Sequence, residues 1–436
     1  MSSCRDAVDL DPLATIRCFA VCVMIGLGLA LTFHAVMRFT GMNWPWTSFL
    51  FTEQDRFNDW HNSVAQAASG DPYFFHGTPA LATYFPGAYL MFGMAVGLGR
   101  DASTLLYLAV SELLLGAAVF SMTLTAARHH PVAVRGGRLE IPLLLVLSLL
   151  CSYPVLFALD RGNVDLWIAA CCTLFVASLG TRFSVWGLTA LAIAISIKGY
   201  PAAFLALSLA RRDFRGVMFC VAAVVGITAL ALLWVGNGMA HDISGLRNNV
   251  QLFIQRYVVG GDSLFASSDP YNAIRLLIVA QGGGATVEEA SAMLLHIYTP
   301  VILLFACVCA FFVLAVPAPA WRRVTAVCLV AILFPNVAND YKLCGLFPGM
   351  LLLLVSGVSG RRKRISLVLF GLLMIPKSYF FFGIHSLSMF VNPMLLAGLA
   401  WQAIADRTAW RRGLRLLRFR LPWYVAALPH ASLRLD

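Results

Sequence analysis

Two aspartates at helical spacing stand out in the first long polar stretch of the chain, residues 51–84. Asp55 and Asp59 are four residues apart, so on a helix their carboxylates share one face. His61 and several aromatic residues follow Asp59, and we expect Asp55 and His61 to contact substrate. A carboxylate held in such a stretch can accept a proton from a hydroxyl group, which is the chemistry of a general base. The alternative is a solvated loop without a chemical role.

A cation between apolar segments is the second candidate for chemistry. Lys198 begins the break Lys198-Gly199-Tyr200-Pro201, which separates two short apolar segments. A charge at the centre of a membrane helix costs at least about 2.5 kcal/mol, so it needs a reason. A broken helix with a cation suits a substrate phosphate, and Tyr200 would lie beside it. The alternative is a lysine that only extends its ammonium group to the membrane surface.

A glycine-containing turn supplies two more polar candidates. Arg161 and Asn163 lie in this turn between two apolar runs, with Asp160 and Asp165 beside them. We expect Arg161 to contribute to a phosphate site and Asn163 to contact substrate. A structural cap with an ion pair would explain the same residues.

Later polar breaks add further candidates. Asp340 and Lys342 interrupt an apolar stretch near the end of the chain, and Arg256 lies in a second long polar stretch. We expect Lys342 at a phosphate and the other two at substrate. For each of them, a solvated loop residue is the alternative.

Composition identifies the elements that must hold these side chains. Of the 436 residues, 60% are hydrophobic and only 12% are charged, and the mean hydropathy is +0.79. This composition predicts a polytopic membrane protein of the all-α class. The ten-residue alternation of a membrane β-barrel is missing from the sequence. The net charge of +11 comes from short basic tracts between apolar runs, so it indicates orientation in a membrane and no nucleic-acid partner.

Several kinds of site have no local motif. The eleven cysteines include no CxxC pair, and the nine histidines form no HxxxH or HExxH. A nucleotide-binding Walker loop and a serine nucleophile elbow are likewise missing from the sequence. We therefore predict no cofactor and no metal.

The apolar runs predict about eleven spans, with short re-entrant and interfacial helices in addition. Residues 86–98 are too short to cross a core about 30 Å thick, and residues 183–197 and 202–210 form a broken pair around Lys198. If residues 86–98 dip in and return, all basic tracts fall on one side, as the positive-inside rule requires. The polar candidates then share the opposite face.

This topology defines the predicted organisation. Residues 1–404 form one transmembrane domain, with outer loops at 38–85 and 236–293. Residues 405–436 form a basic amphipathic tail on the anionic inner leaflet. The expected location is the inner or plasma membrane, with the C-terminus cytoplasmic and the active face extracytoplasmic.

Four segments, taken in order, resemble glycosyltransferase family 87. They read FNDWHNSVAQAASGDPY, TYFPGAYLMF, LDRGNVDLW and AISIKGYPAAFLALSLARRDFRG. Members of that family are membrane enzymes of the GT-C fold that use polyprenyl-phosphate sugars, mannosyl donors among them. The similarity covers about the first half of the chain, while the second half matches mainly in layout, through PNVANDYKLCGLFPGMLLLL.

The resemblance implies a role for several residues. Asp59 matches the general base for the acceptor hydroxyl, Lys198 matches the lysine near the donor phosphate, and Tyr84 belongs to the Tyr-x-Pro motif before a helix. Family members often carry a histidine near residues 339–342, where this chain has none, and Lys342 is the candidate to replace it. A single displacement would invert the anomeric carbon without a metal or a nucleotide.

The implied partners are a polyprenyl-phosphate sugar, a lipid or glycan acceptor, and membrane lipids. Two alternatives remain open. An O-antigen ligase or polymerase type of enzyme would also fit, because the second outer loop carries several arginines. A lipid-linked-sugar transporter or flippase would explain the charges without catalysis, although the two halves of the chain do not repeat.

Overall fold

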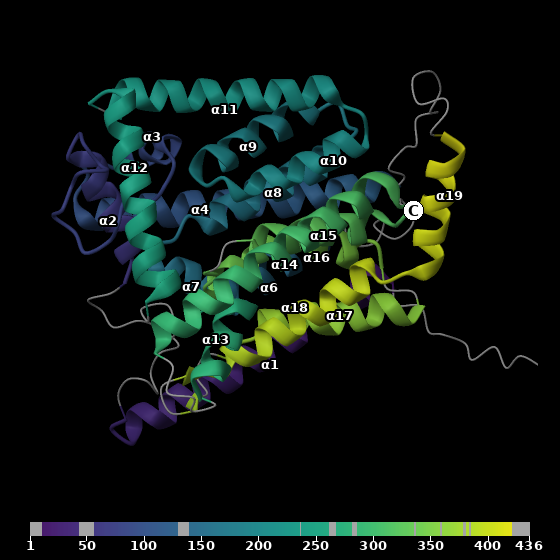
Figure 1. Ribbon diagram of the computed structural model, residues 1–436. Coiled ribbons are helices and arrows are strands. Elements are labelled where there is room, and N and C mark those ends of the chain that lie inside the picture. Colours follow the sequence, from purple (N-terminus) through teal and green to yellow (C-terminus); the bar gives the residue numbers. More distant parts are fainter. Residues whose placement is uncertain are drawn as a thin grey trace, which may run out of the picture.

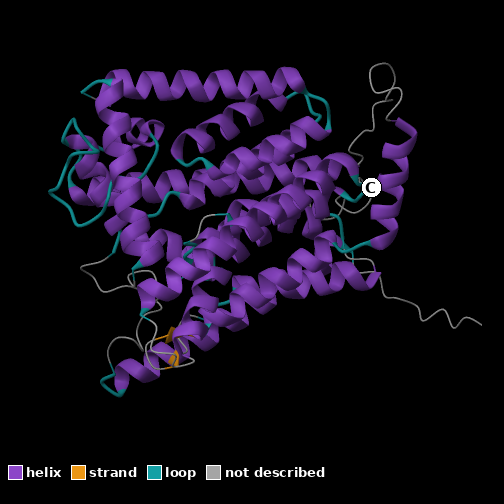
Figure 2. Cartoon of the chain, in the orientation of Figure 1, coloured by secondary structure: helices purple, strands orange, loops and turns teal. Residues whose placement is uncertain are grey.

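The structure is a computed structural model of the whole chain. The residues that it describes are 11–42, 56–129, 139–235, 237–260, 267–280, 286–334, 337–357, 360–377, 381–382 and 385–420. Most of them are helical (Figures 1 and 2), which confirms the predicted all-α class. Two short strands, β1 (Phe381–Phe382) and β2 (His385–Ser386), pair antiparallel.

Four helices of the described residues are long and apolar enough to cross a membrane. Local sequence fixes where two of them begin. Asp11 precedes the first and accepts a hydrogen bond from the N–H of Ala14 at 2.6 Å. Thr286 and Glu289 form a capping box at the start of the last. The four are α1 (Pro12–Phe39), α4 (Arg100–His129), α11 (Phe214–Val235) and α14 (Val287–Ala315).

Two further candidate spans are bent pairs of helices. The apolar run 141–159, one of the spans counted from the sequence, consists of α6 (Glu140–Leu150) and α7 (Tyr153–Arg161), which meet at 59°. Pro154 starts α7, because its ring fits the first turn of a helix and not the interior. The second pair, α18 (Ser388–Ile404) and α19 (Arg407–Arg420), bends by 47°. With both pairs the described residues hold up to six spans, so the count of eleven is not confirmed.

Several predicted spans are short helices in the structure. The break at Lys198 is confirmed, because its backbone is extended and Pro201 then opens a short 3-10 helix, η1. The short helices are α8 (Asp165–Ser178), α9 (Ser184–Ile197), η1 (Tyr200–Phe204), α10 (Leu205–Ala210), α15 (Ala320–Leu333), η3 (Asp340–Leu346), α16 (Phe347–Val355) and α17 (Gly360–Met374).

Both predicted outer loops contain helices. The first loop holds α2 (Asn58–Ala68) and is followed by α3 (Pro86–Gly93). The second holds α12 (Met239–Phe253), the π-helix η2 (Ile254–Val259) and α13 (Pro270–Ala280). Figure 1 shows α2, α3 and α12 at the same end of the molecule, opposite to α19 (Arg407–Arg420).

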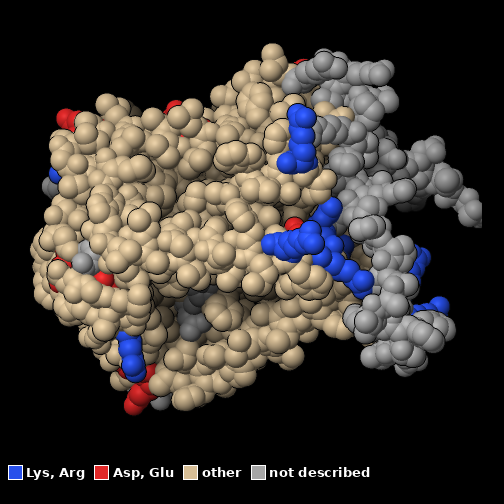
Figure 3. Space-filling model, turned by 90° about the horizontal axis from the view of Figure 1, so that it is seen from above, with Lys and Arg blue, Asp and Glu red and all other residues tan. Residues whose placement is uncertain are grey.

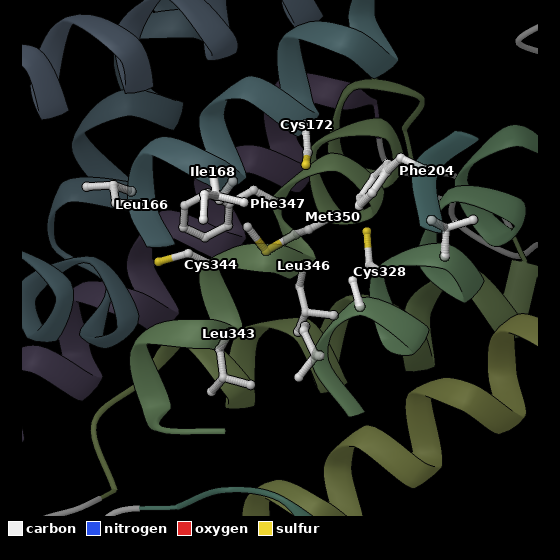
Figure 4. Close-up of a cluster of buried hydrophobic side chains, with 14 of the residues drawn as sticks. Leu166, Ile168, Cys172, Phe204, Cys328, Leu343, Cys344, Leu346, Phe347 and Met350 are labelled. Atoms are coloured by element: carbon white, nitrogen blue, oxygen red, sulfur yellow. The ribbon is translucent and has the colours of Figure 1, made fainter. Parts of the chain in front are cut away.

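The core lies where α8, η1, α15, η3 and α16 meet (Figure 4). Ile168, Cys172, Phe204, Cys328 and Phe347 are all buried there. The first turns of α8 and η3, and the break before η1, carry the polar candidates. Helices in a membrane are held together by close packing and hydrogen bonds between them, so this tightly packed core fixes the polar ends of three elements relative to one another.

Described basic residues from several segments gather at the end of the molecule that carries α19. Arg322 donates to Asp406 at 2.8 Å, and Arg362 donates to the carbonyl of Gln402 at 2.8 Å, so both hold the junction of α18 and α19. In Figure 3 most of the visible lysine and arginine side chains gather toward this end, and a broad neutral surface lies beside them. The predicted tail begins as the helix α19, and residues 421–436 lie outside the described part of the chain.

Candidate active site

A glycine turn brings the first polar loop against the end of α7. Gly162 ends α7 with φ +70°, a conformation that favours glycine. A Cβ at Gly162 would lie 2.7 Å from Cβ of Trp60 and 3.0 Å from Cα of Phe57, so a side chain does not fit. The N–H of Phe57 also donates to the carbonyl of Asp160 at 2.7 Å. This close approach places the start of α2, and with it Asp59, beside the turn.

Asp59 is held by the two polar residues of this turn. Its Oδ1 accepts from Nη2 of Arg161 at 2.5 Å, and its Oδ2 accepts from Nδ2 of Asn163 at 2.8 Å. The side chain of Asp59 is 21% exposed, so the carboxylate still meets solvent. Each carboxylate oxygen has about two lone pairs, so both can accept a further hydrogen bond. The pattern suits an oriented carboxylate that can still take a proton.

Asn163 connects this carboxylate to the start of α8. Its Oδ1 accepts from the backbone N–H of Asp165 at 3.0 Å, which fixes the orientation of its amide. Tyr107 also holds the turn, because its single hydroxyl proton is shared between the carbonyl oxygens of Ala158 and Asn163, at 3.0 and 3.1 Å. Asn163 is therefore a positioning residue for Asp59.

Lys198 is held by a buried carboxylate. Its Nζ lies 2.9 Å from both oxygens of Asp165, whose side chain is only 1% exposed. Tyr200 donates its hydroxyl to Oδ1 of the same carboxylate at 2.8 Å. Nζ also lies 5.0 Å from the ring centroid of Tyr84. With 22% of its side chain exposed, Lys198 presents its ammonium group at the edge of the core.

These contacts form one continuous charged network. It contains two ion pairs, Asp59 with Arg161 and Asp165 with Lys198, and Asn163 joins them. The members of the charged network are Asp59, Arg161, Asn163, Asp165, Lys198 and Tyr200. The structure therefore brings together five of the residues predicted from the sequence.

Asp165 is the member that sequence reasoning did not select. It was noted only as a neighbour of Arg161, although it anchors both Lys198 and Tyr200. The usable signal was its position: an acidic residue in the first turn of a helix, directly after a glycine turn, in an apolar run. Buried carboxylates are normally paired, so its partner had to be a cation elsewhere in the chain.

The late polar break borders the charged network from another side. The helix η3 contacts α7 and α8. The charges of Asp59, Asp165 and Arg161 are near enough to the hydroxyl of Tyr341 to interact with it electrostatically. Lys342 follows, and its ammonium group donates to the carbonyl of Val337. The charges of Asp165 and Lys198 are near enough to interact with this ammonium group electrostatically. The same helix thus puts Lys342 near the charged network.

Asp340 points to a different polar cluster. Its Oδ1 accepts from the hydroxyl of Ser268 and from Nδ2 of Asn392, the latter at 3.1 Å. Both partners are buried, and they come from the second loop and from α18. Asp340 therefore joins the loop to the helix core and is not a member of the charged network.

The remaining predicted residues lie on other contacts. Nε2 of His61 lies 3.2 Å from the hydroxyl of Thr104, and burial, followed by the charge of Arg100, lowers the pKa of His61. Arg256 is exposed on η2, with its guanidinium 5.3 Å from the ring centroid of Tyr257. Asp55 lies outside the described residues. The substrate contacts predicted for these residues stay predictions.

Comparison with known proteins identifies the family but no individual relative. The family model of glycosyltransferase family 87 matches residues 82–335, which include Tyr84, the glycine turn, Lys198 and the whole second loop. A comparison with curated proteins gives no match. The match covers more than half of the chain and includes both sides of the charged network except Asp59. The chain belongs to glycosyltransferase family 87 and is a membrane glycosyltransferase.

Proposed function

We propose that the protein transfers a hexose from a polyprenyl-phosphate donor to a lipid or glycan acceptor. Mannose is the first sugar to test, because the family resemblance includes mannosyl donors. The observation that carries the proposal is the charged network, in which an oriented carboxylate and a cation lie on linked contacts. A sugar on a lipid phosphate already has its leaving group, so the enzyme needs only a base and a cation.

The proposed reaction is a single displacement. Asp59 accepts the proton of the acceptor hydroxyl while the hydroxyl oxygen forms a bond to the anomeric carbon. The bond from that carbon to the phosphate oxygen breaks, and the polyprenyl phosphate leaves with the electron pair. Attack opposite the leaving group inverts the anomeric centre. The chemistry requires no metal and no nucleotide.

The arrangement of Lys198 supports its role at the donor phosphate. An ammonium group has three N–H donors, and Asp165 receives two of them at 2.9 Å. Phosphate can take the third while the buried carboxylate keeps the lysine in place. Arg161 and Lys342 are the further cations proposed at the phosphate. A guanidinium has five donors, so the contact of Arg161 with Asp59 is compatible with both roles.

We further propose that the active face is extracytoplasmic. The support is the separation of charges along the molecule. Basic side chains gather at the end of α19, whereas α2 and α12 lie at the other end (Figures 1 and 3). Under the positive-inside rule, the end with α19 is cytoplasmic and contacts the anionic lipids of the inner or plasma membrane. Donor lipids would reach Lys198 from the outer leaflet.

Membership of a glycosyltransferase family favours catalysis over transport. The O-antigen ligase or polymerase alternative depends on arginines of the second loop acting on substrate. Arg275, one of the arginines that suggested it, is buried and donates to the carbonyl of Gly260 and to the hydroxyl of Ser291, both at 3.0 Å. It supports the loop from inside, so this observation does not favour the alternative.

The test is transfer by the purified protein from a polyprenyl-phosphate sugar. Asp59→Asn keeps the shape of the side chain but cannot accept the proton, and loss of a general base costs about a hundredfold to ten-thousandfold in rate. Asp55→Asn and Asp101→Asn are the controls, and both should lose far less. Transfer from a nucleotide sugar alone, without polyprenyl phosphate, would refute the lipid donor. Full activity of Asp59→Asn would refute the base.

A further inference from the structure

Two carboxylates and one imidazole gather beyond the end of α2 that is far from Asp59. Asp71 follows α2, and His241 and Asp242 lie in the first turn of α12. One ligand atom from each of the three lies within 4.8 Å of the other two. We call these residues the Asp71 cluster. The helix between it and Asp59 is about 16 Å long, at about 1.5 Å per residue, so the cluster is separate from the charged network.

Three oxygen atoms of the Asp71 cluster are buried and lack a hydrogen-bond partner among the described residues. They are Oδ1 and Oδ2 of Asp242 and Oδ1 of Asp71. Asp242 as a whole is only 2% exposed. The backbone N–H of Asn237 is near enough to stabilise the charge of the Asp242 carboxylate, but it does not reach hydrogen-bond geometry. A buried carboxylate without a partner is costly, so these oxygens point to a cationic ligand.

The hydrogen bonds inside the cluster do not satisfy these atoms. Nε2 of His241 and Nδ2 of Asn237 both lie 2.9 Å from Oδ2 of Asp71, and neither contacts the oxygens named above. The two carboxylates lie close together, and three of their oxygens lack a partner among the described residues, an arrangement that a doubly charged cation would balance.

The donor set indicates the class of cation. Imidazole favours transition metals such as zinc, and carboxylates bind zinc at about 2.0–2.2 Å. In a tetrahedral site with such bonds, ligand atoms lie about 3.4 Å apart, within the 4.8 Å limit here. Phe74 stacks on His241 with ring centroids 4.0 Å apart, and Asn237 holds Asp71, so both ligands are already oriented. Such support is typical of metal sites.

We propose that Asp71, His241 and Asp242 bind one divalent metal ion of the zinc class, which fastens the first outer loop to α12. The contact surface is already close, because Asn249 of α12 donates to the carbonyls of Tyr73 and Ala82 at 2.9 and 3.2 Å. The hydroxyl of Tyr73 donates in turn to the carbonyl of Tyr84 at 3.0 Å. The metal has a structural role and takes no part in the displacement.

The three ligands come from segments 170 residues apart, so no local spacing could reveal the site. The inference does not depend on the proposed function, because its test measures binding and stability. Full-length protein in detergent is stripped with EDTA, dialysed, and titrated with Zn2+, with Ca2+ as the comparison ion. Bound metal per chain and the melting temperature are both recorded.

Wild-type protein should bind one Zn2+ per chain more tightly than Ca2+, and its melting temperature should rise with Zn2+. His241→Ala and Asp242→Asn should weaken binding by at least about tenfold, the lower end for loss of even a supporting residue. His76→Ala removes another exposed histidine of the same loop and should change nothing. His241 is exposed, so its variant tests the site even if Asp242→Asn fails to fold.

The opposite results would overturn the proposal. They are a wild-type protein that binds no Zn2+, or binding that His241→Ala leaves unchanged. Binding that His76→Ala weakens as much as His241→Ala would equally show nonspecific association with surface histidines. A melting temperature that Zn2+ raises equally in the wild type and in His241→Ala would place the stabilising metal elsewhere.

Discussion

Replacing Lys198 by methionine tests whether this lysine is a substrate ligand or only a structural partner of Asp165. The substitution keeps most of the length of the side chain and removes its charge. Asp165 then remains 1% exposed without its cation, while Tyr200 still donates to it. Two separate losses should follow, one in stability and one in transfer.

The structure sets the size of both losses. Removing one partner of a buried ion pair costs about 3–5 kcal/mol. Lys198 is 22% exposed and Tyr200 keeps its hydrogen bond, so we expect the lower end of this range. Losing a charge-assisted contact to phosphate costs about 1.5–3 kcal/mol, which lowers kcat/KM by about ten- to a hundredfold.

A second substitution separates the two losses. The double variant Lys198→Met/Asp165→Leu removes both charges, and an apolar replacement of a buried pair is often neutral or stabilising. Its melting temperature should therefore recover toward that of the wild type, while kcat/KM for the polyprenyl-phosphate donor stays low. The assays are thermal melting in detergent and transfer at varied donor concentration. If the double variant regained activity together with stability, Lys198 would have only a structural role and its place at the phosphate would be wrong.

Two further predictions concern the placement of α2 and the orientation of the chain. Gly162→Ala should lower transfer at least about tenfold, because the new Cβ displaces α2 and its carboxylate, whereas Gly97→Ala, also at positive φ but with open space around it, should not. Gly162→Ala with normal activity would contradict the close approach. In a variant without native cysteines, cysteines at the exposed positions Ser69 and Ser244 should react with an impermeant maleimide in intact cells, and one at Thr408 should not. The reverse pattern would overturn the orientation.

Local sequence predicted those parts of the fold that depend on local chemistry. Apolar composition was enough for the all-α class, and the Gly-Tyr-Pro break ended α9 at Ile197. The bend between α6 and α7 was not predicted, although Pro154 is visible in the sequence. Counting apolar residues measures whether a segment can enter a membrane and not whether its helix is continuous. Proline occurs in the first turn of a new helix and also at a kink in a longer one, so Pro154 alone does not distinguish two helices from one bent helix.

The site shows a similar boundary between local and distant information. Asp59 and Lys198 could be selected because each is a charge in an unusual local setting. Their partners could not be assigned, because Arg161 lies 102 residues from Asp59, and Asp165 lies 33 residues from Lys198. Asp340 shows the converse. It interrupts an apolar run as Lys342 does, yet it bonds to Ser268 and Asn392, and no local pattern distinguishes the two directions.

The pairing within the charged network also explains how the protein can keep a base and a cation ready at the edge of an apolar core. An isolated charge there would cost several kcal/mol, so each charge needs a partner. The protein uses two pairs instead. Asp165 balances Lys198, and Arg161 balances Asp59. Asn163 lies between the two pairs and connects them through its amide. The four charges of the network balance before substrate arrives, so in the proposed reaction the donor phosphate would bind the third N–H of Lys198 while Asp165 keeps the lysine in place. The acceptor hydroxyl would meet a carboxylate whose orientation is already fixed.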